Sequence, residues 1–254
     1  MLVFTLAGLF VGSFLNVCID RFPSGDSILS VHSNCDSCGK SLRIVDRIPI
    51  ISYLNLQGHC RSCSVRIPIR HLTVEIGTAL LFAVIWLRYP GSWETAVVAF
   101  YSSLLIVFLV IDLEKDTVLD RVSYPAIAVA LLFALWIPDR TLPQMLVGGL
   151  IAFGSLLAIE LLFPARRGKG VAKLAAFIGL ALGYPGVWVA LLLTLVVGVV
   201  ITGALVLTKR MGRKDPIAIG PFLAVGAIAA MLFGELIVTW GEGGIEQIVR
   251  LLSF

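Results

Sequence analysis

The sequence predicts an all-α, polytopic membrane protein with about eight transmembrane helices. Hydrophobic residues make up 58% of the 254-residue chain and charged residues only 14%, against roughly 25% charged residues in a soluble domain. The mean hydropathy is +0.97. Apolar runs of around 20 residues recur, and segments that alternate polar and apolar residues, as in a membrane β-barrel, do not appear. Helices are therefore the expected spanning elements, because they satisfy their own backbone hydrogen bonds.

Eight apolar segments are long enough to be considered as spans. The first, residues 1–19, is as hydrophobic as a signal peptide but lacks a basic start and an A-x-A cleavage site, so we interpret it as a retained helix. Proline and glycine residues separate the later segments. Residues 171–182 form the shortest of them. The other predicted spans are residues 72–87, 93–111, 122–137, 142–163, 187–207 and 217–240.

The basic residues predict the orientation in the membrane. If the N-terminus lies outside, the cytoplasmic segments are residues 20–71, 112–121, 164–173 and 208–216, and they hold 17 of the 20 Lys and Arg residues. Basic loops resist translocation, so this division supports both the direction and the number of spans. The net charge of +4 is then a topology signal, and we expect a lipid bilayer as partner and no nucleic acid.

The polar segment of residues 20–71 carries two C-x₂-C pairs, Cys35 with Cys38 and Cys60 with Cys63. Two such pairs suit a tetrahedral zinc site, because each pair turns two thiolates toward one ion. Two disulfides are the alternative, which a reducing cytoplasm disfavours. Four thiolates fill the coordination shell, so the expected role of the metal is structural. The predicted domains are residues 1–71, the first helix plus a small cytoplasmic zinc-binding segment, and residues 72–254, a multi-helix transmembrane domain.

An acidic residue, Asp112, ends the apolar run of residues 106–112. A carboxylate at the end of a membrane-length helix is costly to place, which makes it a site hypothesis. The alternative is an ordinary helix end with its charges solvated at the level of the lipid headgroups.

Several longer motifs resemble one family. Residues 12–23 (GSFLNVCIDRFP), the two cysteine pairs, residues 47–54 (RIPIISYL) and Glu75 resemble the N-terminal half of the bacterial prepilin peptidases, also called type IV leader peptidases. The second half looks similar too, over the stretches DLEKDTVLDRVSYP from Asp112, KLAAFIGL from Lys173 and IGPF from Ile219. The resemblance covers nearly the whole chain in the right order.

This resemblance implies an intramembrane aspartic endopeptidase of the G-x-G-D type in the bacterial inner membrane. Such enzymes cut the basic leader from prepilins and pseudopilins of type IV pilus and type II secretion systems at the cytoplasmic face. Many also methylate the new N-terminus with S-adenosylmethionine. Asp112 matches the first of the two catalytic aspartates. The chemistry needs two neighbouring carboxylates, whose repulsion separates their protonation so that one is base and the other acid.

The second aspartate is where the chain departs from the family. The motif G-x-G-D-x-K-L falls on GKGVAKL, residues 168–174, which places Val171 where the acid is expected. Valine cannot activate water, so the chain as written is expected to be a poor peptidase or none. Three explanations remain open: an inactivated variant, a natural pseudo-enzyme, or a sequence that omits part of a glycine-rich loop. A non-catalytic zinc-bearing membrane protein, for example a pilus-assembly interaction partner, is the alternative function.

Other residues have simpler structural interpretations. Glu160 and Glu235 are read as lying well inside their spans, where they make structural hydrogen bonds or face an internal polar cavity, rather than as substitute acids. Glu75 is expected to pair with Arg70 or His71, with a substrate or methyl-donor site as the alternative. Asp120 is expected to cap the following helix rather than assist the site. Asn16 predicts an interhelical hydrogen bond. Close helix contacts are predicted at Gly12, Gly148, Gly149 and Gly154.

Overall fold

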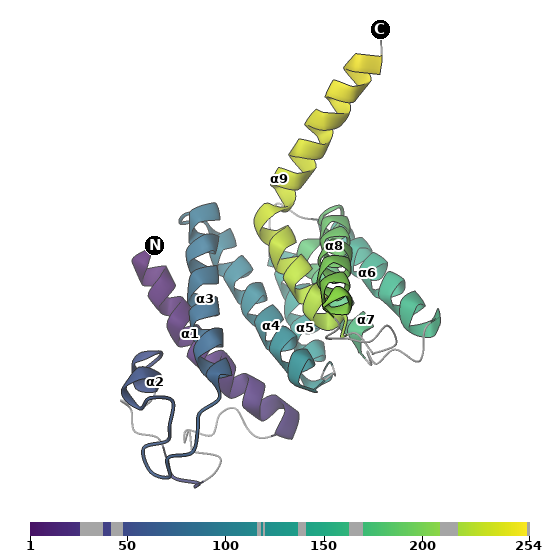
Figure 1. The fold of residues 1–254 in the computed structure, drawn as a ribbon. Helices are drawn as coiled ribbons and strands as arrows, with labels where there is room; N and C mark the ends of the chain where they lie inside the picture. The colour runs from purple at the N-terminus through teal and green to yellow at the C-terminus, as the bar shows by residue number, and fades with distance from the viewer. Residues whose placement is uncertain are drawn as a thin grey trace. The chain divides into compact units, whose positions relative to one another are not determined.

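The described part of the chain is helical in the computed structural model (Figure 1). The structure describes residues 1–25, 38–41, 48–115, 118, 120–136, 141–162, 170–208 and 218–252, with side chains described up to residue 239. Two compact units divide the chain, unit 1 at Met1–Val107 and unit 2 at Phe108–Phe254. The helices are α1 (Leu2–Ser24), α2 (Ile51–Asn55), α3 (Ile69–Arg88), α4 (Trp93–Lys115), α5 (Asp120–Trp136), α6 (Leu142–Leu162), α7 (Val171–Leu182), α8 (Gly186–Leu207) and α9 (Gly220–Leu252).

Each predicted span coincides with one of these helices. Six of them, α1, α3, α4, α6, α8 and α9, are long and apolar enough to cross a membrane. The other two, α5 with 17 residues and α7 with 12, are shorter. The chain is therefore a multi-pass membrane protein, while the count of eight spans stays a prediction.

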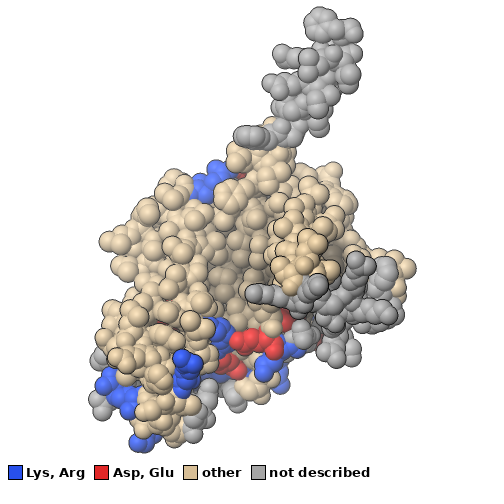
Figure 2. All heavy atoms as spheres, viewed as in Figure 1, with Lys and Arg blue, Asp and Glu red and all other residues tan. Residues whose placement is uncertain are grey.

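In unit 1, α1 and α3 pack closely through glycine. A Cβ atom added at Gly12 would lie 2.8 Å from Cα of Glu75, and one added at Gly8 would lie 2.9 Å from Cα of Ala79. The ring of Phe4 stacks on that of Phe82 with centroids 5.0 Å apart. Figure 2 shows Lys and Arg side chains over the polar segment of this unit, at the lower left, and uncharged helix surfaces directly above it. The division into apolar helices and a basic polar segment follows the sequence pattern.

In unit 2, α7 is the central helix. Ten of its 12 residues are buried, and it contacts α5, α6, α8 and α9. By contrast, only Val187 and Ala190 of α8 are buried, as expected for a helix that faces lipid. The burial of α7 is the reason why an apolar segment this short still forms a helix in the protein.

A seam of four glycines joins α6 to α7. A Cβ atom at Gly148 would lie 2.7 Å from the carbonyl carbon of Gly183 and would also overlap the carbonyl oxygen of Gly179. One at Gly149 would lie 2.9 Å from Cγ of Leu180. These contacts confirm the predicted close approach at both positions. The prediction for Gly154 is wrong, because a Cβ atom there would meet nothing within 4 Å.

Candidate active site and metal centre

Asp112 lies in the last turn of α4 and is buried, with a relative exposure of 3%. Its carboxylate lies against Gly220, the first residue of α9, where a Cβ atom would overlap Oδ2. Asp112 is therefore not a solvated helix end, and any residue larger than glycine at position 220 would displace it.

The first turn of α7 packs on the connection that follows α4. The ε-ammonium of Lys173 donates a hydrogen bond of 2.6 Å to Oδ1 of Asp120 and lies 4.9 Å from the ring centroid of Tyr124. Gly170 has φ +95°, and a Cβ atom there would lie 3.0 Å from the carbonyl oxygen of Val118. A glycine is needed here both for its backbone angle and for space. Asp120, the first residue of α5, thus pairs with Lys173.

A contact between two phenyl rings joins α4 and α7. The rings of Phe108 and Phe177 have centroids 6.0 Å apart. Since the start of α7 lies at the end of α4, the two helices run in opposite directions, and Asp112 and Val171 lie at the same end of unit 2. Val171 itself is 2% exposed and packed among apolar side chains. The position where the family motif carries its second acid is therefore filled by a buried hydrocarbon.

A second acid, Glu160, also contacts the start of α7. Its Oε1 accepts a hydrogen bond of 3.1 Å from the backbone N–H of Ala172, the residue after Val171. The expectation of a structural hydrogen bond is confirmed, but its placement well inside a span is wrong. Glu160 lies two residues before the end of α6. Sequence spacing could not reveal this contact, because it depends on which face of α6 turns toward α7.

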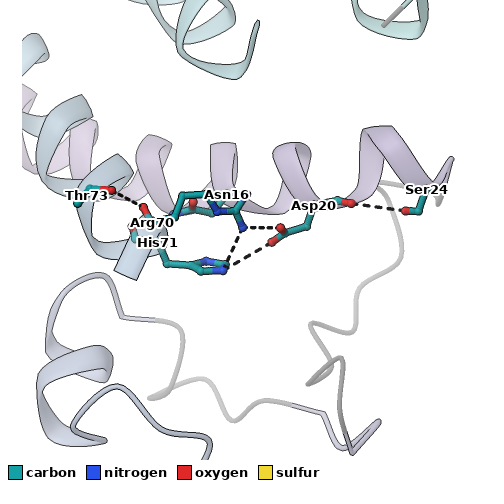
Figure 3. Close-up of polar contacts among 6 residues, drawn as sticks. All are labelled: Asn16, Asp20, Ser24, Arg70, His71 and Thr73. Atoms are coloured by element: carbon teal, nitrogen blue, oxygen red, sulfur yellow. Dashed lines mark hydrogen bonds and ion pairs between the residues drawn. The ribbon is translucent and has the colours of Figure 1, made fainter. Parts of the chain in front are cut away.

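Polar side chains also connect α1 and α3 in unit 1 (Figure 3). Nδ2 of Asn16 donates a hydrogen bond of 3.0 Å to the carbonyl oxygen of His71, which confirms the predicted interhelical bond. The guanidinium of Arg70 pairs with Oδ1 of Asp20. Nε2 of His71 lies 3.8 Å from Oδ2 of the same carboxylate. These contacts join the last turns of α1 to the first turn of α3, and so bring together the two ends of the polar segment of residues 20–71.

Glu75, a residue of α3, anchors the polar segment of residues 20–71 by a hydrogen bond. Its Oε2 accepts a hydrogen bond of 2.8 Å from the backbone N–H of Ile50, and its carboxylate accepts a second from the side chain of Ser13. The predicted pairing with Arg70 or His71 is therefore wrong. Ile50 has φ +62°, a strained angle for a β-branched residue, and the bond to Glu75 holds it there.

Three of the four predicted zinc ligands lie together. The Sγ atoms of Cys38, Cys60 and Cys63 lie within 4.8 Å of one another, and none of the three forms a disulfide. Around Cys60 the backbone makes a tight turn, with hydrogen bonds of 2.8 Å from its N–H to Val65 and of 2.9 Å from the N–H of Ser64 to its carbonyl. Thiolates about 2.3 Å from zinc stand about 3.8 Å apart in a tetrahedron, so the cluster fits a metal with small shifts. Cys35 is outside the described residues.

Comparison with known proteins identifies the family. Residues 6–89 match the Bacterial Peptidase A24 N-terminal domain, and residues 99–206 match the Type IV leader peptidase family. Proteins named Prepilin leader peptidase/N-methyltransferase are similar over nearly the whole chain. The one from Pseudomonas putida is 30% identical and covers 98% of this chain and 94% of its own length. The one from Bacillus subtilis (strain 168) is 32% identical and covers 92% of this chain and 94% of its own length.

A third relative with the same name, from Aeromonas salmonicida (strain A449), is 30% identical over 92% of this chain and 91% of its own length. No solved structure matches the chain. The two family matches follow each other along the chain, one on unit 1 and the other mostly on unit 2, in the order of the motifs described above. The chain therefore belongs to the Type IV leader peptidase family.

Proposed function

We propose that the chain is a prepilin leader peptidase of the aspartic type and that Asp112 is one of its catalytic carboxylates. The burial of this carboxylate at the end of a membrane-length helix, against the start of α9, is the observation that carries the proposal. A carboxylate can take a proton from water as the water attacks a peptide carbonyl. Its position at a helix end suits a substrate whose scissile bond lies where its own helix leaves the membrane.

The substrates are prepilins and pseudopilins with a basic leader, in line with the names of the relatives. Cleavage then takes place at the cytoplasmic face of the bacterial inner membrane, with the N-terminus outside and residues 20–71 in the cytoplasm. The distribution of Lys and Arg residues supports this orientation.

A second activity belongs to the same proposal. The relatives are named N-methyltransferases as well as peptidases, so the chain is expected to methylate the new N-terminal amine with S-adenosylmethionine. Transfer of a labelled methyl group from S-adenosylmethionine to an already cleaved pilin peptide tests this separately from cleavage. No transfer at a rate above that of the peptide alone would contradict it.

The metal proposed for the cysteine cluster is zinc with a structural role. The sulfurs of Cys38, Cys60 and Cys63 supply three ligands, and Cys35 is proposed as the fourth. Four thiolates leave no open position for a substrate, so the ion would hold the polar segment folded and take no part in hydrolysis.

The test of the peptidase proposal is cleavage of a prepilin-like peptide by the purified chain in detergent. Asp112→Asn keeps the size of the side chain and removes its charge, and we expect it to abolish cleavage. Glu94→Gln removes a carboxylate from the opposite end of α4 and serves as the matched control, with cleavage unchanged. Equal cleavage by the Asp112→Asn variant and the control would refute the role of Asp112.

The buried Val171 favours the alternative of a non-catalytic family member that interacts with the pilus-assembly machinery. Val171→Asp is the variant that separates the two. Cleavage that appears only with the restored acid would assign the native chain to this alternative. Cleavage by the native chain would exclude it.

A further inference from the structure

We infer that Glu160 supplies the second carboxylate of the peptidase site, in place of the acid that the family motif leads one to expect at position 171, where the chain has Val171. The inference rests on the proposed peptidase function. The family motif identifies where the missing acid belongs, namely the first residue of α7. A carboxylate from another helix, α6, reaches that same turn.

The distance between the two positions is short. Oε1 of Glu160 lies 3.1 Å from the amide nitrogen of Ala172. That nitrogen is about 2.4 Å from the Cα atom of Val171 by standard peptide geometry. The Glu160 oxygen is therefore no more than about 5.5 Å from that Cα atom, so its carboxylate lies beside the first residue of α7.

Glu160 and Asp112 lie toward the same end of unit 2. The contact between the rings of Phe108 and Phe177 is a point that α4 and α7 share. Asp112 is four residues from Phe108, or about 6 Å along the helix axis, and Ala172 is five residues from Phe177, or about 7.5 Å. Both steps lead toward the same end of unit 2. The two carboxylates, which come from different helices, thus lie toward the same end of unit 2.

For the proposed role, one oxygen of Glu160 must be held in place and the other must take part in proton transfer. The bond from the N–H of Ala172 orients Oε1 of Glu160, and Oε2 is the oxygen that we assign to proton transfer. In the hydrolysis, Asp112 takes a proton from water as the water oxygen bonds to the peptide carbonyl carbon. Glu160 gives its proton to the amide nitrogen as the carbon–nitrogen bond breaks. The products are a carboxylic acid and an amine, with no other reactant.

The decisive variant is Glu160→Gln. Glutamine keeps an oxygen that can accept the hydrogen bond from Ala172, so the cap on α7 is retained while the acid is lost. With the full-length chain in detergent and a prepilin-like peptide, we expect cleavage to fall by about 100-fold or more, the usual scale for losing a general acid or base. Its helical content and thermal unfolding midpoint should match those of the native chain. Glu94→Gln is the control and should cleave normally.

A double variant shows whether a loss of cleavage comes from the lost acid or from misfolding. The double variant Glu160→Gln/Val171→Asp should regain cleavage, because the acid returns from the other helix. Failure to regain it would mean that the first substitution had only displaced α7, which overturns the inference. Unchanged cleavage by Glu160→Gln alone would make Glu160 a helix cap and would overturn it as well.

The same set of variants separates this inference from the peptidase proposal. If the native chain is silent and Val171→Asp cleaves, Glu160 is not the second acid, while the proposed site around Asp112 stands. If the native chain, Val171→Asp and the double variant are all silent, both fail.

Discussion

Replacing Gly148 by alanine tests whether the glycine seam sets the position of α7. The new Cβ atom would lie 2.7 Å from the carbonyl carbon of Gly183 and would overlap the carbonyl oxygen of Gly179. Both neighbours are backbone atoms, which cannot rotate away, so α6 and α7 must separate by several tenths of an ångström. Overpacking of this kind costs about 1–3 kcal/mol. The higher helix propensity of alanine returns about 1 kcal/mol of that, so we expect a net loss of up to about 2 kcal/mol.

The same helix offers a matched control. A Cβ atom at Gly154 would meet nothing within 4 Å, so Gly154→Ala should stabilise the protein by up to about 1 kcal/mol through helix propensity alone. Reversible unfolding of the purified chain in mixed detergent micelles, followed by circular dichroism, measures both free energies. Gly148→Ala should also slow peptide cleavage, because Glu160 and α7 would separate. Equal stabilities for the two variants would refute the reasoning that the seam is tight.

Three further outcomes are expected. The purified chain should contain about one zinc ion per molecule by elemental analysis, and Cys60→Ser should lose it; a native chain with no metal and reactive thiols would contradict this. Glu75→Ala leaves the N–H of Ile50 without its acceptor and should speed limited proteolysis of the polar segment, whereas Glu75→Gln keeps the acceptor and should not; equal proteolysis of the two would rule out the anchor. Asp120→Asn should cost under about 1 kcal/mol of unfolding free energy, because its pair with Lys173 is solvent-exposed; a larger loss would mean that the start of α7 depends on this pair.

The sequence predicts the helices well and their contacts less well. Every predicted span is a helix because long apolar runs leave the backbone no other way to satisfy its hydrogen bonds in lipid. Gly148 and Gly154 look equivalent in the sequence, yet only the first meets another helix. Helix-face geometry decides this, and the apolar pattern on α6 is nearly uniform around its circumference. A uniformly apolar helix gives no signal for which side packs on protein.

The sequence predicts the candidate site only where residues that are close in the sequence form a recognisable pattern. Asp112 stands out because an acid ends an apolar run, and the cysteine pairs because their spacing suits a metal. Glu160 and Glu75 do not stand out, since each bonds to a backbone N–H from a segment distant along the chain. Backbone groups carry no sequence signature, so such contacts appear only once the helices are assembled. Val171 is the opposite case, because the family motif alone marks it as unusual.

The length of α7 bears on how the ends of a short helix are kept away from lipid. A helix of 12 residues is about 18 Å long, against a hydrocarbon thickness of about 30 Å. At least one end of α7 therefore ends below the level of the lipid headgroups. Backbone groups at that depth are tolerated only when protein surrounds them or water reaches them. Ten of the 12 residues of α7 are buried, so the surrounding helices of unit 2 meet this condition and shield the ends of a helix that is too short for the bilayer from lipid.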